Sequence, residues 1–531
     1  MATKSLDELT FNNRYTATLP ADPSTEIRPR EVRGASFSRV TPKTTAAPKI
    51  IGISPEMVAA LELDTAVVDT DRFAAVMTGN EVLDGMDTYA ACYGGHQFGN
   101  WAGQLGDGRA IALGEVETSS GEHYTLQLKG AGPTPYSRSA DGLAVLRSSV
   151  REFLCSEAMH HLGVPTTRAL SLALTGDQVL RDMFYNGNAA FESGAIVCRV
   201  APSFVRFGNF ELPSSRQDID LLRATADHTI RTDFPHLGEP SPEVYAAWFG
   251  EIVDRTADMI VHWMRVGFVH GVMNTDNMSI HGLTIDYGPY GWLEDFDPNW
   301  TPNTTDAGRK RYRFGAQPAI AQWNLMQLAN AIYPLIEKAE PLQAALDGYV
   351  ERYQTGYQTM MANKLGLDRF DPEVDEDLMA DLLNVLQLAE TDMTIFYRNL
   401  ADVDLAAGAS ADDRFAPLAE AYYVPEQLTT EVRSQIDAWL VRYADRVEAS
   451  TLSADARVKL MNATNPKYVL RNYLAQLAID KADAGDYAMI TELLDVLRHP
   501  YDDQPGNETF AEKRPDWART RPGCSMLSCS S

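Results

Sequence analysis

The stretch HGVMNTDN at residues 270–277, followed by DYG at residues 286–288, is the most informative part of this sequence. It sets an acidic and an amide side chain next to each other, Asp276 and Asn277, with a second carboxylate, Asp286, close behind. Carboxylate and amide oxygens are the ligands that Mg²⁺ accepts together with substrate phosphates. The stretch predicts a metal-dependent phosphate site, while an Asx turn leading into a hairpin is the simpler structural alternative.

Kinases arrange the same residue types in a similar order. They place His-x-Asp before four residues and then Asn, with Asp-Phe-Gly further on; the first Asp accepts the substrate proton, and the Asn and second Asp hold the metal ions. Here His270 and Asn277 keep that spacing, but Val272 stands where the catalytic Asp belongs, and Asp276 is an additional acid. The spacing predicts a kinase-like fold with a retained metal site and a displaced base, doing something other than ordinary phosphate transfer.

The residues upstream follow the order of a kinase small lobe. Residues 110–116 and 123–129 predict a β-hairpin that ends at Lys129. Residues 143–162 place apolar side chains on one helical stripe and predict a helix that carries Glu152. A lone Lys at a strand end is usually solvated, but a Glu on the following helix favours a phosphate-binding Lys–Glu pair.

Three further features are compatible with a nucleotide site, and each has a plain structural alternative. The glycine-dense segment 94–108 lets backbone N–H groups approach phosphates, or it forms two surface turns. Asp141 and Gly142 either contact the nucleotide or form a turn before the helix. Arg199 and Arg206 either grip phosphate oxygens or are surface arginines on a strand.

The chain is predicted to be α+β, a protein-kinase-like two-lobed fold with a β-rich small lobe, a mainly helical large lobe and extensions at both ends. Past residue 207 the pattern is mainly helical, with an amphipathic helix at 248–266 and helices over most of 318–500. Residues 278–285 predict a tight hairpin that presents Asp286 at its end. The predicted parts are an N-terminal extension packed on the small lobe (1–90), the small lobe (91–206), the large lobe (207–500) and a C-terminal tail (501–531).

Composition narrows the class of protein. The 531 residues carry a formal net charge of −27, which argues against nucleic acid as a partner. No apolar run reaches the length of a membrane span, the first residues lack a signal-peptide core, and five cysteines indicate a reducing compartment. We expect a cytoplasmic, monomeric enzyme that does not bind membranes, with the acidic run 294–297 as a solvated face. The histidines show no zinc-site spacing.

Together these motifs resemble the selenoprotein O family, kinase-fold protein adenylyltransferases. The segments that carry the likeness are YGGHQFGNWAGQLGDGR (93–109), LKGAGPTPYSR (128–138), VLRSSVREFL (145–154), RVAPSFVRFGNFE (199–211) and HGVMNTDNMSIHGLTIDYGPYG (270–291). The resemblance implies Asp276 as the catalytic base and Asn277 and Asp286 as metal ligands, with Glu152 in support of Lys129. The nucleotide-binding residues it implies are Gly106, Gly108, Arg109, Lys129, Asp141, Gly142, Arg199, Arg206 and Asp286.

The family is understood to bind ATP in an orientation flipped relative to kinases. The resemblance therefore implies transfer of AMP from ATP to Ser, Thr or Tyr hydroxyls of protein substrates with Mg²⁺ or Mn²⁺, and UTP as a possible second donor. Two rivals stay open: an ordinary kinase that uses Asp276 as a displaced base, and a catalytically dead ATP-binding scaffold.

Two cysteines lie close to the C-terminus. The resemblance implies that bacterial members often carry a Cys after the metal-binding Asp that is able to form a disulfide with the C-terminal Cys, but the comparable stretch 299–306 has no Cys here. Cys529 is therefore expected to pair with Cys524 or with no other residue of the chain, with less redox sensitivity than in those relatives.

Overall fold

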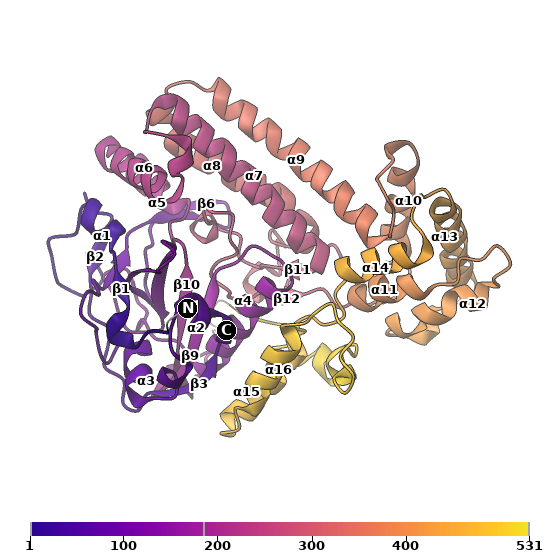
Figure 1. Cartoon of the computed structure of the whole chain (residues 1–531), viewed down its shortest axis with the longest axis horizontal. Coiled ribbons are helices and arrows are strands. Elements are labelled where there is room, and N and C mark those ends of the chain that lie inside the picture. The colour runs from indigo at the N-terminus through magenta and orange to yellow at the C-terminus, as the bar shows by residue number, and fades with distance from the viewer. Residues whose placement is uncertain (1–2, 184–185, 529–531) are drawn as a thin grey trace.

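The structure is a computed structural model that describes residues 3–183 and 186–528, and it combines a large antiparallel sheet with a long helical region (Figure 1). The strands of the sheet come from the first two hundred residues, and the sequence after them is mainly helical. This arrangement confirms the predicted mixed α+β class. No helix in the described part of the chain has both the length and the apolar character needed to cross a bilayer.

The sheet has eight strands in the order β2-β4-β7-β8-β10-β9-β3, with β1 paired to β7 outside that path. The predicted hairpin at 110–129 is confirmed as β7 and β8. All the ladders are antiparallel. The strands are β1 (Thr10–Phe11), β2 (Phe37–Arg39), β3 (Lys49–Ile53), β4 (Tyr89–Ala91), β7 (Ala110–Glu117), β8 (His123–Lys129), β9 (Arg168–Arg181) and β10 (Ala190–Ala201).

Helix α4 (Leu146–His161) lies on the sheet and is buried over most of its length. Its sequence predicts one apolar stripe, yet Glu152, Glu157 and Arg151 are buried as well. The reason is that α4 contacts β9 and β10 on one side and two C-terminal helices, α15 (Asn472–Asp483) and α16 (Ala488–Leu497), on the other. The helix is thus enclosed between the sheet and the end of the chain (Figure 1).

A separate two-stranded hairpin, β5 (Gly94–Gln97) and β6 (Asn100–Gln104), stands apart from the sheet. We call it the flap. It contacts the short 3₁₀ helix η4 (Thr275–Asn277), which contains the predicted base. Residues 94–104 of the glycine-dense segment therefore form a β-hairpin that meets the segment containing Asp276 and Asn277.

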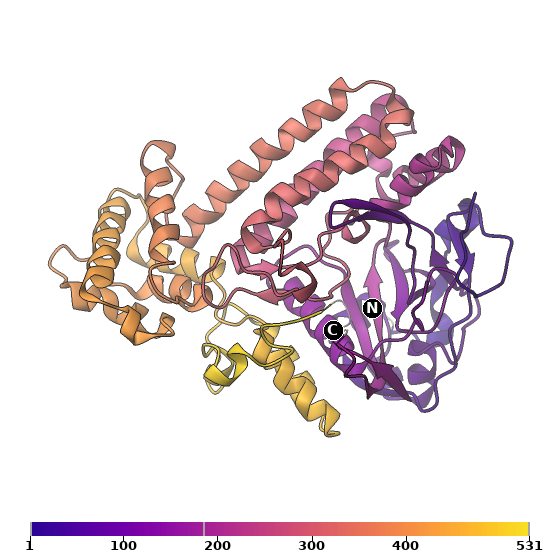
Figure 2. The same cartoon turned by 180° about the vertical axis from the view of Figure 1, so that it is seen from behind.

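The helical region forms two groups (Figures 1 and 2). The long helices α7, α8 and α9 lie side by side, and α10 to α14 form a bundle at the far end of the molecule. The helices are α5 (Gly208–Ser215), α6 (Ile219–Asp233), α7 (Pro242–Val266), α8 (Gln317–Ile336), α9 (Glu340–Lys364), α10 (Pro372–Val385), α11 (Met393–Asn399), α12 (Ala411–Phe415), α13 (Thr430–Glu448) and α14 (Ala454–Thr464). The sheet region adds α1 (Arg14–Thr18), α2 (Pro55–Ala60) and α3 (Asp71–Met77).

The structure modifies two expectations about local elements. The predicted helix 248–266 begins earlier, because Ser241 caps it and Pro242 occupies its first turn. The predicted hairpin at 278–285 is reduced to a single bridge between Met278 and Thr284, because Thr284 also bridges Thr166. In place of that hairpin, the short strands β11 (Phe268–Val269) and β12 (Gly291–Trp292) pair on either side of the segment.

Candidate active site

A cavity of about 670 Å³ lies between the edge of the sheet and the segment 272–289. The residues around it come from β7, β8 and β10, from the loop before α4, and from the segment that contains η4. Ten of the predicted site residues line it: Gly106, Gly108, Arg109, Lys129, Asp141, Gly142, Arg199, Asp276, Asn277 and Asp286.

A cluster of buried charges lies at the inner end of this cavity; Lys129, Arg199 and Asp286 line the cavity, whereas Glu152 and the predicted site residue Arg206 pair with them without lining it. Lys129 Nζ lies 2.6 Å from Glu152 Oε2, as the order of strand and helix predicts. Arg199 is shared between Glu152 and Asp286, and Arg206 donates to the other carboxylate oxygen of Asp286. The two arginines are 3% and 1% exposed, so the alternative of surface arginines is wrong.

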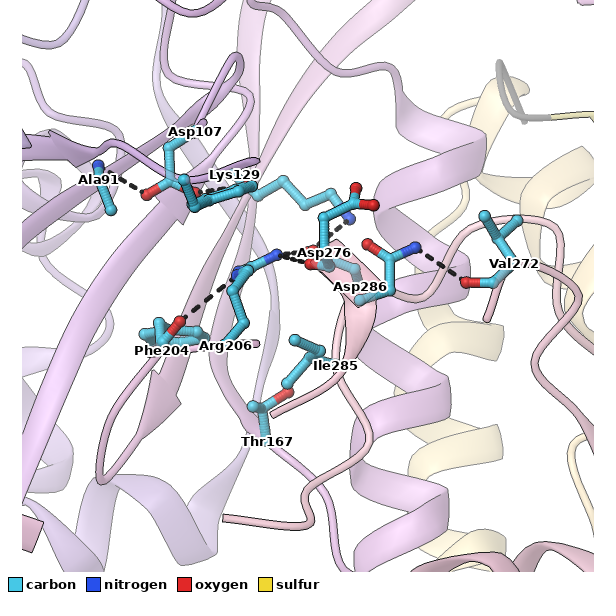
Figure 3. Close-up of polar contacts among 12 residues, drawn as sticks. Ala91, Asp107, Lys129, Thr167, Phe204, Arg206, Val272, Asp276, Ile285 and Asp286 are labelled. Atoms are coloured by element: carbon cyan, nitrogen blue, oxygen red, sulfur yellow. Dashed lines mark hydrogen bonds and ion pairs between the residues drawn. The ribbon is translucent and has the colours of Figure 1, made fainter. Parts of the chain in front are cut away.

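Asp286 is the anion on which these cations converge, and Figure 3 shows the side chain of Arg206 directed at it. Burial acts to raise the pKa of Asp286, but the charges of Arg206, Arg199 and Lys129 outweigh burial and hold that pKa well below its ordinary value. The Asp286 backbone has a φ of 57°, in the left-handed region where an ordinary side chain is uncommon. The fold thus places an ionised carboxylate at this point at some conformational cost.

The strand register explains why the cations meet. Gln127 and Lys129 are two residues apart on β8, so their side chains point to the same face of the sheet. Arg199 on β10 stands directly opposite Gln127 in the ladder, and its guanidinium donates to the Gln127 amide oxygen. Gln127 was missed in the sequence, although its place two residues before Lys129 is a signal that could have identified it.

His270 connects the two halves of the motif. It is 1% exposed, and its Nε2 lies 2.9 Å from the carbonyl oxygen of Ile285, the residue before Asp286. Asn277 donates from Nδ2 to the carbonyl oxygen of Val272 at 2.9 Å. These bonds fix the loop so that Asn277 and Asp286 both line the cavity.

Asp276, the predicted base, lies below the flap. It is 8% exposed, and Gln97 Nε2 donates to its Oδ2 at 3.3 Å. Burial raises the pKa of Asp276 to about 7, against the opposing effects of Gln97 and Arg206. A carboxylate with a raised pKa and one solvent-shielded oxygen without a partner, Oδ1, has the properties of a proton acceptor.

The glycines of the cavity wall are required by close packing. Gly106 has a φ of 78°, and a Cβ there would lie 2.4 Å from Tyr136. A Cβ on Gly142, whose φ is 73°, would lie 2.2 Å from the carbonyl oxygen of Gly132. At Gly108 it would meet the carbonyl oxygen of Tyr136 at 2.9 Å. Larger residues would therefore displace the backbone that lines the cavity.

Another ion pair and a further arginine line the cavity away from the Asp286 cluster. Asp141 forms a bidentate ion pair with Arg181, with contacts of 2.7 and 2.8 Å, and both residues line the cavity. Arg109 lies on the same wall. Arg181 comes from the end of β9 and was missed in the sequence, because nothing local indicates that β9 reaches the loop before α4.

Two more buried residues near the site were not anticipated. Asp107, between the two glycines, is 3% exposed and accepts from the backbone N–H of Ala91 (Figure 3). It also accepts from Gln127 Nε2 at 3.2 Å. Gln97, in the flap, contacts Asp276. Asp107 could have been suspected as the acid in LGDGR, whereas the partner of Gln97 lies 179 residues away.

The donor set fits a hard divalent cation. The Asn277 side-chain oxygen and the Asp286 carboxylate face the cavity, and Asp276 Oδ1 is buried without a hydrogen-bond partner. Oxygen ligands of this kind suit Mg²⁺ or Mn²⁺ when phosphate completes the coordination. A second acidic group, Glu56, Glu157 and His161, is less suited, because Arg498 and Arg168 already neutralise its two carboxylates.

Two expectations outside the cavity are affected by the structure. The run 294–297 is not simply a solvated face: Glu294 is 7% exposed and pairs with Arg514 at 3.0 Å.

Cys524 is buried, and burial raises the pKa of its thiol to about 11, which disfavours the thiolate that disulfide exchange requires. Cys529 lies outside the described residues, so the predicted pairing stays a prediction.

Comparison with known proteins agrees with the geometry. A family profile described as Protein adenylyltransferase SelO matches residues 26–498. Relatives named Protein nucleotidyltransferase YdiU include one from Rhodopirellula baltica, 60% identical over 99% of both chains, and one from Aromatoleum aromaticum, 58% identical over 99% of this chain and 100% of the relative. One from Flavobacterium johnsoniae is 55% identical over 99% of this chain and 100% of the relative. The chain therefore belongs to the SelO family of protein adenylyltransferases.

Proposed function

We propose that this protein nucleotidyltransferase transfers AMP from ATP to Ser, Thr or Tyr hydroxyls of protein substrates. The observation that carries the proposal is the position of three buried cations: Lys129 and Arg199 line the inner end of the cavity, and Arg206 pairs there with the lining residue Asp286 without lining the cavity itself. A triphosphate that enters with its outer phosphates first would meet them and leave its α-phosphate nearer the opening. This is the flipped orientation that the family resemblance implies.

The reaction then follows from the neighbouring groups. The acceptor hydroxyl oxygen attacks the α-phosphorus, the bond from that phosphorus to the α,β-bridging oxygen breaks, and pyrophosphate leaves. The hydroxyl proton passes to Asp276, whose Oδ1 has no other partner. Lys129, Arg199 and Arg206 stabilise the charge that develops on the leaving pyrophosphate. Positioning and charge neutralisation thus account for the chemistry without a covalent intermediate.

We assign Asn277 and Asp286 as the residues that would hold Mg²⁺ or Mn²⁺, which would neutralise phosphate charge when bound. Asp286 now binds Arg199 and Arg206. These arginines are free to exchange the carboxylate for phosphate oxygens, which offer the same bidentate geometry. Glu152 would keep Lys129 oriented, and the glycines at 106, 108 and 142 would let the backbone approach the nucleotide.

We also propose that the architecture is a two-lobed kinase-like fold, with a small lobe over 91–206 and a large lobe over 207–500, between the extension 1–90 and the tail 501–531. Support comes from the strand–strand–helix order that brings Lys129 to Glu152 and from the segment 270–288. The base is displaced by four positions from the usual kinase location, at Asp276 instead of Val272. UTP as an alternative donor and a cytoplasmic location belong to the same proposal.

A labelling experiment tests the reaction. The protein is incubated with Mg²⁺ or Mn²⁺ and an acceptor protein, with ATP labelled at either the α- or the γ-phosphate. We expect label on protein from α-labelled ATP alone, and none with Asp276→Asn. Label from the γ-position would support a kinase, and no label from either would support an ATP-binding scaffold.

A further inference from the structure

A short basic run stands out in this acidic chain. Residues 309–313 read RKRYR, four cations in five residues of a protein with a formal net charge of −27. Arg309 and Lys310 are exposed, and Arg313 is partly exposed. The run follows η5 (Thr304–Asp306) in the segment between Asp286 and α8.

Within the described residues, none of these four cations forms an ion pair. Some arginines elsewhere on the surface do have acidic partners: the exposed Arg352 pairs with Asp258 and the partly exposed Arg433 with Asp412, both at 2.7 Å. Asp306, three residues before the run, is 2% exposed, and its carboxylate accepts the backbone N–H groups of Arg311 and Tyr312. The charges of Arg309, Lys310 and Arg313 are therefore available to an outside partner.

The run is held firmly against the catalytic segment. Tyr312 donates to Asn274 Oδ1 at 2.6 Å, and its hydroxyl accepts from the backbone N–H of Phe98 in the flap at 2.9 Å. Arg311 stacks on Trp323 with its Cζ 4.7 Å from the ring centre, and a Cβ placed on Gly99 would lie 3.3 Å from that Cζ. Asn274 is two residues before Asp276, so the run borders the site of proton transfer.

None of the four cations lines the cavity that would receive the nucleotide. The cations at the inner end of that cavity are a different set: Lys129 and Arg199 line it, and Arg206 pairs with Asp286. Phosphate binding therefore does not explain the run, and its place beside Asp276 sets it on the side from which an acceptor hydroxyl must approach.

We propose that Arg309, Lys310 and Arg313 form a docking surface for acidic residues that flank the modified hydroxyl of the protein acceptor. This proposal rests on the proposed adenylyl transfer. The acidic remainder of the chain would repel an acidic segment, so attraction confined to this run would fix both the position and the direction of the bound acceptor. The formal net charge of −27 on the whole chain disfavours nucleic acid as the occupant of this surface.

The test uses three synthetic peptides of equal length with one central Ser, flanked by Asp and Glu, by Gly and Asn, or by Lys. Transfer from α-labelled ATP is measured as kcat/KM. From the usual strength of exposed ion pairs, we expect the acidic peptide to exceed the neutral one by about tenfold at low salt. High ionic strength should remove most of that preference, because exposed charges are screened.

The double variant Arg309→Gln/Lys310→Gln should lose most of the preference and keep the wild-type Kd for ATP. The matched control, Lys338→Gln/Lys481→Gln, removes the same charge from exposed positions elsewhere and should keep the preference. Binding of a fluorescent acidic peptide, followed by anisotropy, repeats the comparison independently of catalysis.

The possible results separate the two proposals. Wild-type transfer without preference for acidic flanks, or a preference that survives the double variant, overturns the docking surface alone. Absence of α-phosphate transfer overturns the proposed function, and the anisotropy comparison then decides the docking surface. Tighter binding of a single-stranded oligonucleotide than of the acidic peptide would assign the run to a nucleic acid instead.

Discussion

At the scale of single residues, the site depends on a balance of buried charges. Asp286 contacts both Arg199 and Arg206, and Lys129 lies 3.9 Å away. Removing one member of a buried pair leaves its partner without compensation, which destabilises a protein by about 3–5 kcal/mol. Substitutions in this cluster must therefore be chosen so that loss of function is separable from loss of the fold.

Replacement of Arg206 by Lys tests which phosphate the inner cations hold. The variant keeps a positive charge near Asp286 but loses the guanidinium fork, so we expect it to fold and to bind ATP about ten- to a hundredfold more weakly. Affinity for AMP should fall much less, because AMP lacks the outer phosphates. Calorimetric titration with ATP and with AMP measures the two dissociation constants. Arg147→Lys, which alters a partly buried ion pair with Glu192 away from the cavity, is the control. Equal losses for ATP and AMP would refute the flipped orientation.

Asp276→Asn should abolish transfer without unfolding the protein. Asp276 has no ion-pair partner in the described structure, and its carboxylate accepts one bond, from Gln97. An amide of the same shape should therefore be tolerated, while loss of a general base costs about 10²–10⁴-fold in rate. Single-turnover rates and the melting temperature give the two readouts. Asp286→Asn, in contrast, should lower both the rate and the melting temperature.

At the scale of elements, the sequence predicts local features well and contacts between distant segments poorly. The Lys129–Glu152 pair was predictable, because a hairpin followed by a helix brings a strand end to the helix face. The burial of Arg199 was not, since it depends on the ladder of β10 with β8 and on Asp286, 87 residues away. The reduced hairpin at 278–285 was mispredicted because Thr284 pairs with a distant segment.

The flap provides a prediction about an element. Gly95 packs against Asp276, and a Cβ there would lie 2.9 Å from the Asp276 Cβ. Gly95→Ala should push β5 away from η4 and lower kcat while KM for ATP stays near the wild-type value. Asn100→Ala, on the exposed part of the same hairpin, is the matched control and should leave kcat unchanged. A rise in KM for ATP with kcat preserved would mean that the flap acts on the nucleotide instead of on the base.

At the scale of the whole molecule, the end of the chain supports the active-site face. Helices α15 and α16 cover α4, and the tail continues to the segment after Asp286. Leu527 donates its N–H to the carbonyl oxygen of Pro302 and accepts from the backbone N–H of Thr304. The tail is thus a structural part of the fold that holds the segment leading to the basic run.

Leu527 and Met526 are neighbours that allow a matched test of this support. Leu527 is 1% exposed and Met526 is 40% exposed. Truncating a buried Leu to Ala costs about 2–5 kcal/mol, whereas an exposed substitution usually costs about 0.5 kcal/mol or less. Leu527→Ala should therefore speed amide hydrogen exchange in residues 302–313 and lower the rate of transfer to acceptors, and Met526→Ala should do neither.

Neither variant should change the Kd for ATP, because neither Leu527 nor the segment 302–313 lines the nucleotide cavity. Faster exchange confined to residues 106–142 would show that the tail supports the nucleotide side of the site, and the assignment of the tail to the acceptor side would then be wrong.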